Sequence, residues 1–357
     1  EFPYLAKSFE ALPSVIQHFW DTASPKFNLI LCGSSQQSMY ADILNEKSPL
    51  YGPADCIIKL QPIALPYLQE AMGLSTAKEA VIHYAFWGGV PRYWKLCLDE
   101  GSLENALRHL LLTPDGTLSD EPGRLLRDEL RDLMLSHTLL STIGNGANRL
   151  SEIAGRLGKN ASELTAPLRR LIDMGFIERE QPFGEENKNS KRSLYHIKDE
   201  FMDAYYQFVA PNTSLIGMGR ENAVWNILKN NMNNYVGHHW ERICRHAISG
   251  QTIDGITYGA ASRWWGTVYN QEKKTGQQIE IDVVAMSIDK KHLLVGECKW
   301  TSPEDANRLL AGLVQKTSLL PFAQNVEHIH TVLFLREPPI NTANNTIFLP
   351  QDIIGML

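Results

Sequence analysis

The sequence predicts a multidomain protein that combines α/β and all-helical parts. Three observations indicate this class: a length of 357 residues, a helix–turn–helix–hairpin pattern in mid-chain, and strands with paired carboxylates near the C-terminus. At about 100 to 200 residues per domain, the length accommodates two or three domains. The composition, 43% hydrophobic and 21% charged, is ordinary for a globular chain.

Composition also excludes several classes of protein. No apolar run reaches the ~18 to 20 residues that span a bilayer, and the N-terminus lacks the regions of a signal peptide, so we expect a cytoplasmic protein without a membrane partner. The five cysteines are far apart and odd in number, which argues against a disulfide framework or a zinc site. The net charge of -6 means that nucleic-acid binding would require local basic patches.

Residues 1–50 are expected to form the first unit. The chain begins without methionine and soon enters an amphipathic stretch at 11–20, so we expect it to start at a fragment boundary. Residues 28–35 form an apolar run that ends in Ser34 and Ser35. Such a run is typical of a buried parallel strand with a functional loop at its carboxyl end.

Residues 51–140 are expected to form a helical unit. The predicted helices lie at 67–74, 78–86, 102–112 and 124–140. A glycine- and proline-containing turn, Gly88 to Pro91, interrupts them and is followed directly by Arg92.

Residues 141–212 are predicted to form a winged helix. A helix at 149–157, a turn, a second helix at 162–174 and a hairpin of strands at 176–179 and 193–197 occur in that order. Several polar and basic side chains of the second helix and the wing could contact DNA phosphates: Ser162, Thr165, Arg169, Arg170, Lys188, Lys191 and Arg192. Basic residues only slightly outnumber acidic ones here, so internal packing is an equally open role for this unit.

Residues 213–357 form the last unit, which carries the residues most suited to chemistry. Helices are predicted at 234–249 and 304–318, and strands at 279–284, 293–300 and 330–335, the first two joined as a hairpin. Because side chains alternate along a strand, Glu297 and Lys299 share one face. By the same rule, Asp282 shares a face with Glu280 and Val284, while Ile279, Ile281 and Val283 cover the reverse.

Two carboxylates and an ammonium group can therefore converge across neighbouring strands. Mg²⁺ takes oxygen ligands from one or two carboxylates and keeps several waters. A nearby lysine can orient a water molecule or stabilise charge on a phosphate. The set suits metal-assisted hydrolysis of a phosphodiester, although a Glu-x-Lys pair taken alone is common on solvated strands.

Several segments, in their order along the chain, resemble the archaeal-type AAA+ ATPases, related to signal-transducing NTPases, that carry a C-terminal domain of unknown function. They are residues 1–5, 29–35, 48–52, 88–91, the winged helix, 236–241 and 280–300. The resemblance implies a remnant of a P-loop ATPase core at 1–50, a helical lid at 51–140, the winged helix at 141–212, and a restriction-endonuclease-like α/β domain of the PD-(D/E)xK type at 213–357.

The resemblance also implies nucleotide-binding residues. Glu1 resembles the second acid of a Walker B strand, Ser34 or Ser35 a sensor of the γ-phosphate, and Arg92 a lid arginine that faces nucleotide. The sequence contains no GxxxxGK[ST] segment, so the phosphate cradle is absent. We therefore expect ATP binding only in a longer parent protein whose N-terminal portion is missing here.

For the last unit, the resemblance implies a nuclease that uses Mg²⁺ and acts on DNA. Asp282, Glu297 and Glu241 correspond to metal ligands, and Lys299 to the residue that orients water or stabilises the transition state. Gln315 and Lys316 are implied to lie near the scissile phosphate on the following helix. Ile281 replaces the proline that customarily precedes the aspartate.

A second hypothesis is a catalytically silent nuclease-like fold that binds DNA or a partner protein and regulates the ATPase. In that case the acids pair with Lys299 and with arginines. Two further pairs bear on the choice: Trp264-Trp265 is expected to pack in a core or interface rather than to stack on bases, and His238-His239 is expected to lie on a helix surface rather than to bind metal.

Overall fold

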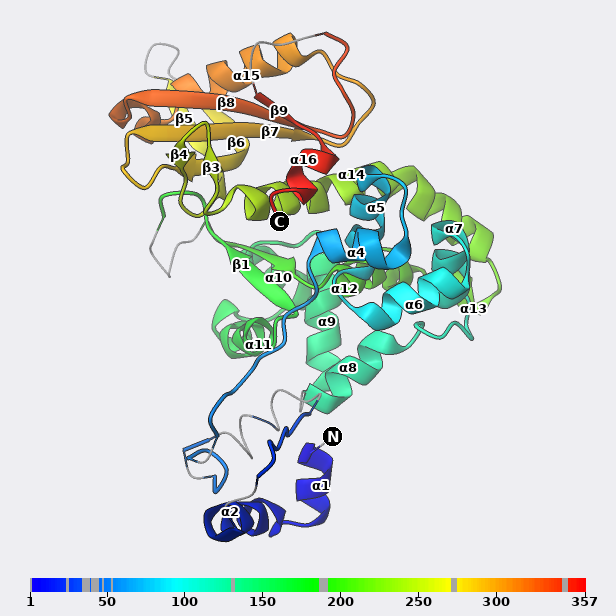
Figure 1. The fold of residues 1–357 in the computed structure, drawn as a ribbon. Coiled ribbons are helices and arrows are strands. Elements are labelled where there is room, and N and C mark those ends of the chain that lie inside the picture. The colour runs from blue at the N-terminus through cyan, green and yellow to red at the C-terminus, as the bar shows by residue number, and fades with distance from the viewer. Residues whose placement is uncertain are drawn as a thin grey trace.

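A long helix, α14 (Glu221–Ile248), joins the helical half of the protein to a C-terminal sheet in the computed structural model (Figure 1). It packs against helix α5, the C-terminal helix α16 and strands β6 and β7. The structure describes residues 2–23, 26–33, 39, 45–46, 48–52, 54–129, 132–185, 192–270, 275–341 and 346–357.

The N-terminal unit consists of two helices and extended chain. The helices are α1 (Phe2–Ser8) and α2 (Leu12–Ala23). The strand predicted at 28–35 is wrong for its described part, because residues 28–33 form no strand and Ile30 is 86% exposed. A buried strand needs neighbours to pair with, and all five strands of the main sheet come from residues 262–348.

Residues 65–129, within the helical unit predicted at 51–140, are mostly helical. The helices are α4 (Leu65–Met72), α5 (Ala77–Trp87), α6 (Pro91–Asp99), α7 (Leu103–Ala106) with the π-turn η2 (Leu107–Leu111), and α8 (Glu121–Glu129). Thr76 begins α5 with a capping box to Glu79, and Pro91 begins α6. The helix predicted at 124–140 is instead two helices, α8 and α9 (Leu133–Gly144).

The order helix, turn, helix and hairpin is confirmed in residues 150–197. It consists of α10 (Leu150–Leu157), α11 (Ala161–Asp173) and the antiparallel strands β1 (Ile177–Glu180) and β2 (Leu194–Ile197). We call residues 133–197 the winged-helix segment. Four short elements follow before α14: α12 (Glu200–Ala204), η3 (Tyr205–Val209), η4 (Ala210–Asn212) and α13 (Thr213–Gly217).

The C-terminal part is a five-stranded sheet of order β5-β6-β7-β8-β9, with α14 on one face and α15 on the other (Figure 1). The strands are β5 (Ser262–Asn270), β6 (Thr275–Met286), β7 (His292–Lys299), β8 (His328–Leu335) and β9 (Thr346–Phe348). The helices are α15 (Ala306–Ser318), the 3-10 turn η5 (Pro321–Asn325) and α16 (Pro350–Ile354), and a small hairpin pairs β3 (Thr252–Ile253) with β4 (Ile256–Thr257).

A bulge in β6 changes the predicted faces of that strand. The first three strands pair antiparallel, as predicted for β6 and β7, but two residues of β6, Asp282 and Val283, lie opposite the single residue Arg263 of β5. Ile281 and Val284 consequently pack in one hydrophobic cluster, whereas Val283 packs in another. The strict alternation predicted for Ile279 to Val284 is wrong here, because a bulge inserts an extra residue and turns the side chains that follow.

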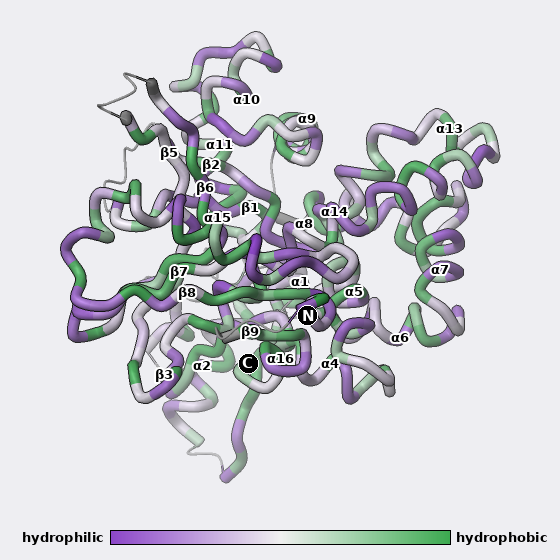
Figure 2. Tube along the Cα trace, turned by 90° about the horizontal axis from the view of Figure 1, so that it is seen from above, coloured by the Kyte–Doolittle hydropathy of each residue, from purple (hydrophilic) through white to green (hydrophobic). Residues whose placement is uncertain are grey.

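The main hydrophobic core extends through residues 65–126, the winged-helix segment and the α14 face of the sheet. Hydrophobic residues run along the central strands β7 and β8, while the outer turns are more hydrophilic (Figure 2). Trp264 and Trp265 are nearly buried, so the prediction that they serve packing is confirmed. Within the described residues, no helix combines the length and apolarity needed to cross a membrane.

Candidate functional site

Asp282 lies at the bulge of β6, beside the end of β7. Its Oδ2 accepts a hydrogen bond of 2.8 Å from the backbone N–H of Cys298, the residue after Glu297. Burial, together with the negative charge of Glu297, raises the pKa of Asp282. The structure therefore brings the two carboxylates that the sequence predicted as partners into electrostatic contact.

Glu297 is buried on β7 and is held by two lysines. Its Oε1 lies 2.7 Å from Nζ of Lys299, and its Oε2 lies 2.8 Å from Nζ of Lys316 on α15. Although burial acts in the opposite direction, these ammonium groups lower the pKa of Glu297. Lys316 thus lies at the site as the resemblance implied, whereas the side chain of Gln315 is exposed.

Glu241 approaches the same site from α14. Burial raises its pKa, and the charge of Asp282 adds to this effect. Its Oε2 lies 3.8 Å from the guanidinium of Arg245, which is one helical turn further on and also donates a 2.9 Å hydrogen bond to the backbone carbonyl of Asp282. Three acids predicted from separate elements therefore influence one another's ionisation.

Two arginines that sequence reasoning did not identify connect this site to the winged-helix segment. Arg245 and Arg263 lie 3.7 and 3.3 Å from the carboxylate of Glu180 at the end of β1. Although burial acts in the opposite direction, His196 and these arginines lower the pKa of Glu180 to about 2. The i,i+4 spacing of Glu241 and Arg245 on a helix was a signal that could have indicated Arg245.

An open cleft of about 380 Å³ begins at this site and follows α14. Glu241 and Lys299 line it at the end near the acids, and Asn230 and Asn234 line it further along the helix. Of the three acids, Glu241 lines this cleft and Asp282 and Glu297 do not, so a ligand in the cleft would reach the site at Glu241 and Lys299.

The donor set suits a divalent cation, although the side chains are not arranged around one. Among the described residues, no three His, Cys, Asp or Glu side chains form a group that could hold a metal ion. Asp282 and Glu241 are nevertheless oxygen donors, and each is raised in pKa by burial among negative neighbours. Positive charge between them would relieve that repulsion, and hard oxygen ligands of this kind are those that Mg²⁺ prefers.

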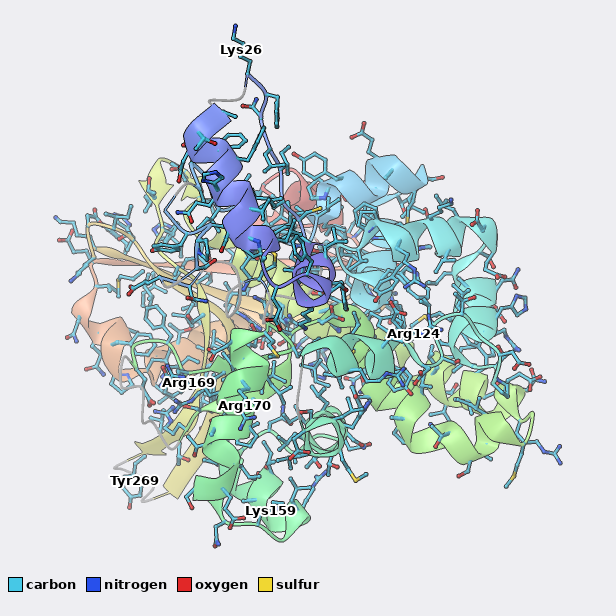
Figure 3. All side chains as sticks on the ribbon, turned by 90° about the horizontal axis from the view of Figure 1, so that it is seen from below. Lys26, Arg124, Lys159, Arg169, Arg170 and Tyr269 are labelled. Carbon is cyan, nitrogen blue, oxygen red and sulfur yellow. The ribbon has the colours of Figure 1, made fainter. Side chains whose placement is uncertain are left out.

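The predicted DNA-contacting residues were placed on helix α11 and in the wing. Ser162, Thr165, Arg169 and Arg170 are exposed on α11, and Figure 3 shows Arg169 and Arg170 on that helix with Lys159 near its start. Arg192 is instead engaged within the protein, since its guanidinium contacts Glu185, the carbonyl of Trp265 and the ring of Trp264. Lys188 and Lys191 lie outside the described residues.

Of the four predicted nucleotide-binding residues, the structure describes Arg92. Glu1, Ser34 and Ser35 lie outside the described residues, so the nucleotide role stays a prediction. Arg92 is half-exposed, and its Nη1 lies 2.6 Å from Oε1 of Glu121.

Of the paired histidines, His238 is exposed as predicted, but His239 is buried, with Nε2 3.0 Å from Oδ2 of Asp203.

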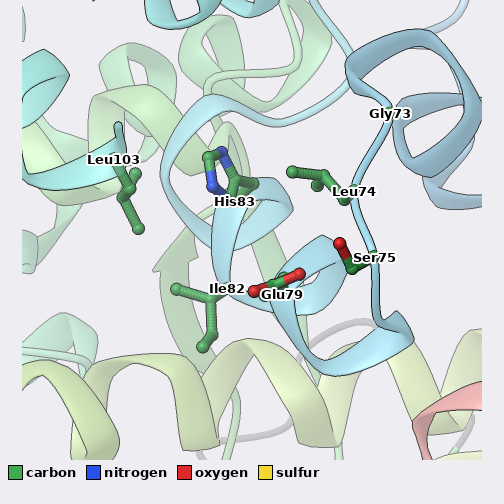
Figure 4. Close-up of a pocket in the computed structure, with 7 residues that line it drawn as sticks. All are labelled: Gly73, Leu74, Ser75, Glu79, Ile82, His83 and Leu103. Atoms are coloured by element: carbon green, nitrogen blue, oxygen red, sulfur yellow. The ribbon is translucent and has the colours of Figure 1, made fainter. Parts of the chain in front are cut away.

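A separate hollow of about 410 Å³ lies within residues 73–103, lined by residues that include Leu74, Glu79 and His83 (Figure 4). His83 Nδ1 is 3.7 Å from Sγ of Cys97. Burial lowers the pKa of His83 to about 4 and raises the pKa of Cys97 to about 11. A neutral imidazole beside a neutral thiol is a poor nucleophilic pair, so this hollow does not compete with the carboxylate site as a candidate catalytic centre.

Comparison with known proteins gives a family but no activity. Residues 205–309 match the family DUF234, described as archaeal and bacterial proteins of unknown function. The chain is 30% identical over 331 residues to the uncharacterized protein MJECL04 of Methanocaldococcus jannaschii, an alignment that covers 90% of this chain and 71% of that protein. No solved structure matches the chain.

Proposed function

Because the chain belongs to the DUF234 family of archaeal and bacterial proteins, for which no function is described, we propose its function from the geometry of the site: a Mg²⁺-dependent DNA nuclease in the C-terminal part. One observation carries the proposal. The backbone N–H that follows Glu297 holds the carboxylate of Asp282 beside the Glu297–Lys299 pair. An acid on one strand, Glu-x-Lys on the next and a third acid on α14 form the donor set of a metal-assisted phosphodiesterase.

Each side chain has a role that follows from its surroundings. Asp282 and Glu241 supply carboxylate oxygens, and Arg245 fixes the backbone of Asp282 relative to α14. Lys299 lines the cleft, so its ammonium group can hold an attacking water or a phosphate oxygen. A bound divalent cation would supply Lewis-acid activation of the phosphate and a nucleophilic water at neutral pH.

The test is cleavage of supercoiled plasmid and of single-stranded DNA with Mg²⁺ or Mn²⁺. We expect nicking that EDTA abolishes, with Asp282→Ala and Lys299→Ala lowering the rate by at least about 100-fold. Glu327→Ala is the matched control, because Glu327 pairs with Lys291 at 2.9 Å in an exposed position before β8 and should leave cleavage unchanged. Cleavage that persists in both site variants would exclude these residues from the mechanism.

A second candidate function has an observation of its own. Both carboxylate oxygens of Glu297 are bonded to lysines, which is the arrangement expected of a silent fold whose charges neutralise one another. That function predicts DNA binding without turnover, sensitive to salt and weakened when Arg169 and Arg170 are replaced. Titration calorimetry with Mn²⁺ separates the two, since a nuclease should release heat in the wild type and not in Asp282→Asn, whereas a silent fold should release none in either.

A further inference from the structure

One face of α14 continues from the candidate site as a polar stripe. Asn230, Asn234, His238 and Glu241 are spaced three or four residues apart, so they lie on one side of the helix. All four line the cleft of about 380 Å³, with Lys299 and Thr301 on the opposite wall. A ligand whose reacting phosphate lies at Glu241 and Lys299 would therefore extend along the asparagines.

The two asparagine side chains are available to a ligand. Both are exposed, and neither amide makes a hydrogen bond to another residue in the described part of the chain. Asn231, on the same helix, differs because it does not line the cleft and its Nδ2 donates to the carbonyl of Ile227 at 2.8 Å. The chain thus contains a matched asparagine outside the stripe.

The amide end of the cleft has the wrong chemistry for a phosphate. Phosphate contacts depend on Lys and Arg, whereas the cleft wall near Asn230 and Asn234 is neutral. The nearby Arg336 forms an ion pair with Glu337, with Nε 3.2 Å from Oε1. Its Nη1 also makes a long contact of 3.4 Å with Oδ1 of Asn233. Asparagine amides carry both donors and acceptors, and they pair in a bidentate manner with base edges, most specifically with N6 and N7 of adenine.

We infer that this cleft binds one unpaired base of the nucleic-acid substrate, next to the scissile phosphate, through the amides of Asn230 and Asn234. The inference rests on the proposed nuclease function and specifies its substrate as single-stranded or locally unpaired DNA. A base within a duplex is stacked on its neighbours, so it cannot enter such a cleft without being unstacked. Single-stranded oligonucleotides are therefore cleaved in preference to fully paired ones.

The experiment measures Mn²⁺-dependent cleavage of labelled single-stranded oligonucleotides by the wild type and by the double variant Asn230→Ala/Asn234→Ala. Loss of two amide contacts to a base should raise KM about tenfold or more and leave kcat unchanged. The slope of log KM against log salt should not change, because no phosphate contact is lost. A single abasic nucleotide, moved stepwise along the oligonucleotide, should raise KM of the wild type at one position next to the cut, and should have no effect there on the variant.

Asn231→Ala is the control and should behave as the wild type, while circular dichroism verifies that all variants are folded. If the wild type cleaves DNA but the double variant matches Asn231→Ala, the inference is overturned and the nuclease function stands. A change in salt slope in the double variant would also overturn it, because that result assigns the amides to the phosphate backbone. If the wild type shows no metal-dependent cleavage at all, the proposed function fails and the inference fails with it.

Discussion

At the residue scale, the candidate site separates its carboxylates into two electrostatic classes. Glu297 is kept ionised by Lys299 and Lys316, whereas burial raises the pKa of Asp282 and of Glu241. The difference arises from partners rather than from depth, since all three side chains are largely buried. The site thus contains one carboxylate held by two close lysines and two carboxylates whose pKa is raised by burial and by negative neighbours.

Glu200, on α12, provides a stability prediction at the same scale. Burial raises its pKa to about 7, because the guanidinium of Arg242, 3.8 Å away, compensates only in part. A folded-state pKa above the unfolded value means that Glu200 causes no loss of stability below about pH 4.5 and an increasing loss as pH rises through 7. Glu200→Gln should therefore match the wild type near pH 4.5 and exceed its stability at pH 8.

The expected gain for Glu200→Gln at pH 8 is on the order of 1 to 3 kcal/mol, at about 1.4 kcal/mol per pKa unit. Urea unfolding of both proteins at the two pH values measures it. A difference in the free energy of unfolding that is the same at pH 4.5 and pH 8 would show that Glu200 does not titrate with a raised pKa.

At the scale of single elements, the Gly88–Gly89 turn between α5 and α6 depends on glycine. A Cβ on Gly89 would lie 2.3 Å from the carbonyl oxygen of Ile63 and 2.4 Å from its nitrogen, and backbone atoms cannot yield easily. The same turn is held by a 2.9 Å hydrogen bond from the N–H of Ile63 to the carbonyl of Gly89. The resemblance singled out this turn, and the structure gives a steric reason for its glycine.

Gly89→Ala should lower the free energy of unfolding by about 2 to 4 kcal/mol, since it forces the backbone apart at a buried turn. Gly155→Ala is the control, because it lies inside α10 with nothing within 4 Å of an added Cβ, and it should be neutral or stabilising by about 0.5 to 1 kcal/mol. Thermal unfolding of both variants measures the contrast. Equal stability of the two variants would contradict the steric account.

Elements defined by local signals were the ones that the sequence predicted well. Helices α4, α5, α10 and α11 and the β1–β2 hairpin carry their own caps, glycines and periodic apolar residues, and all were found near the predicted bounds. Strand β5 was not predicted, because its pairing with β6 is not visible in its own residues. The bulge at Asp282 arises from the same strand pairing, so the sequence did not predict it either. For α14, only 234–249 was predicted, since its first half is rich in asparagine and is stabilised by packing of Val224, Trp225 and Leu228.

At the scale of the site, the sequence predicted the acids and lysines but missed the arginines that contact their neighbours. Four elements contribute Asp282, Glu297, Lys299, Glu241 and Lys316 to one network of charge. The first three were predicted from the strand pattern, and Glu241 and Lys316 from the family resemblance. Arg263 was missed because its partner Glu180 belongs to β1, far away in sequence, whereas the helical spacing of Arg245 from Glu241 was a local signal that was not used.

At the scale of the whole molecule, α14 makes separate unfolding of its neighbours costly. The hydroxyl of Tyr235 lies within hydrogen-bond distance of two carbonyl oxygens, those of Ala85 in α5 at 2.8 Å and Glu200 in α12 at 3.0 Å, and shares its one proton between them. Five residues further on, Nε1 of Trp240 donates to the carbonyl of Phe334 in the sheet at 3.1 Å. One helix thus supplies buried contacts to three parts of the chain, and their side chains belong to one hydrophobic cluster.

The winged-helix segment belongs to the same cluster, so we expect it to unfold in a single transition with helices α4 to α6 and the sheet. Far-UV circular dichroism and tryptophan fluorescence should give superimposable urea curves. Tyr235→Phe leaves two buried carbonyl groups without this donor, so it should shift both curves equally and lower stability by about 1 to 3 kcal/mol. Tyr67→Phe is the control, because Tyr67 is 62% exposed and its loss should have little effect. Two resolved transitions, or a Tyr235→Phe shift in only one signal, would mean that the helix does not couple the parts, and that the C-terminal sheet could be studied as an independent domain.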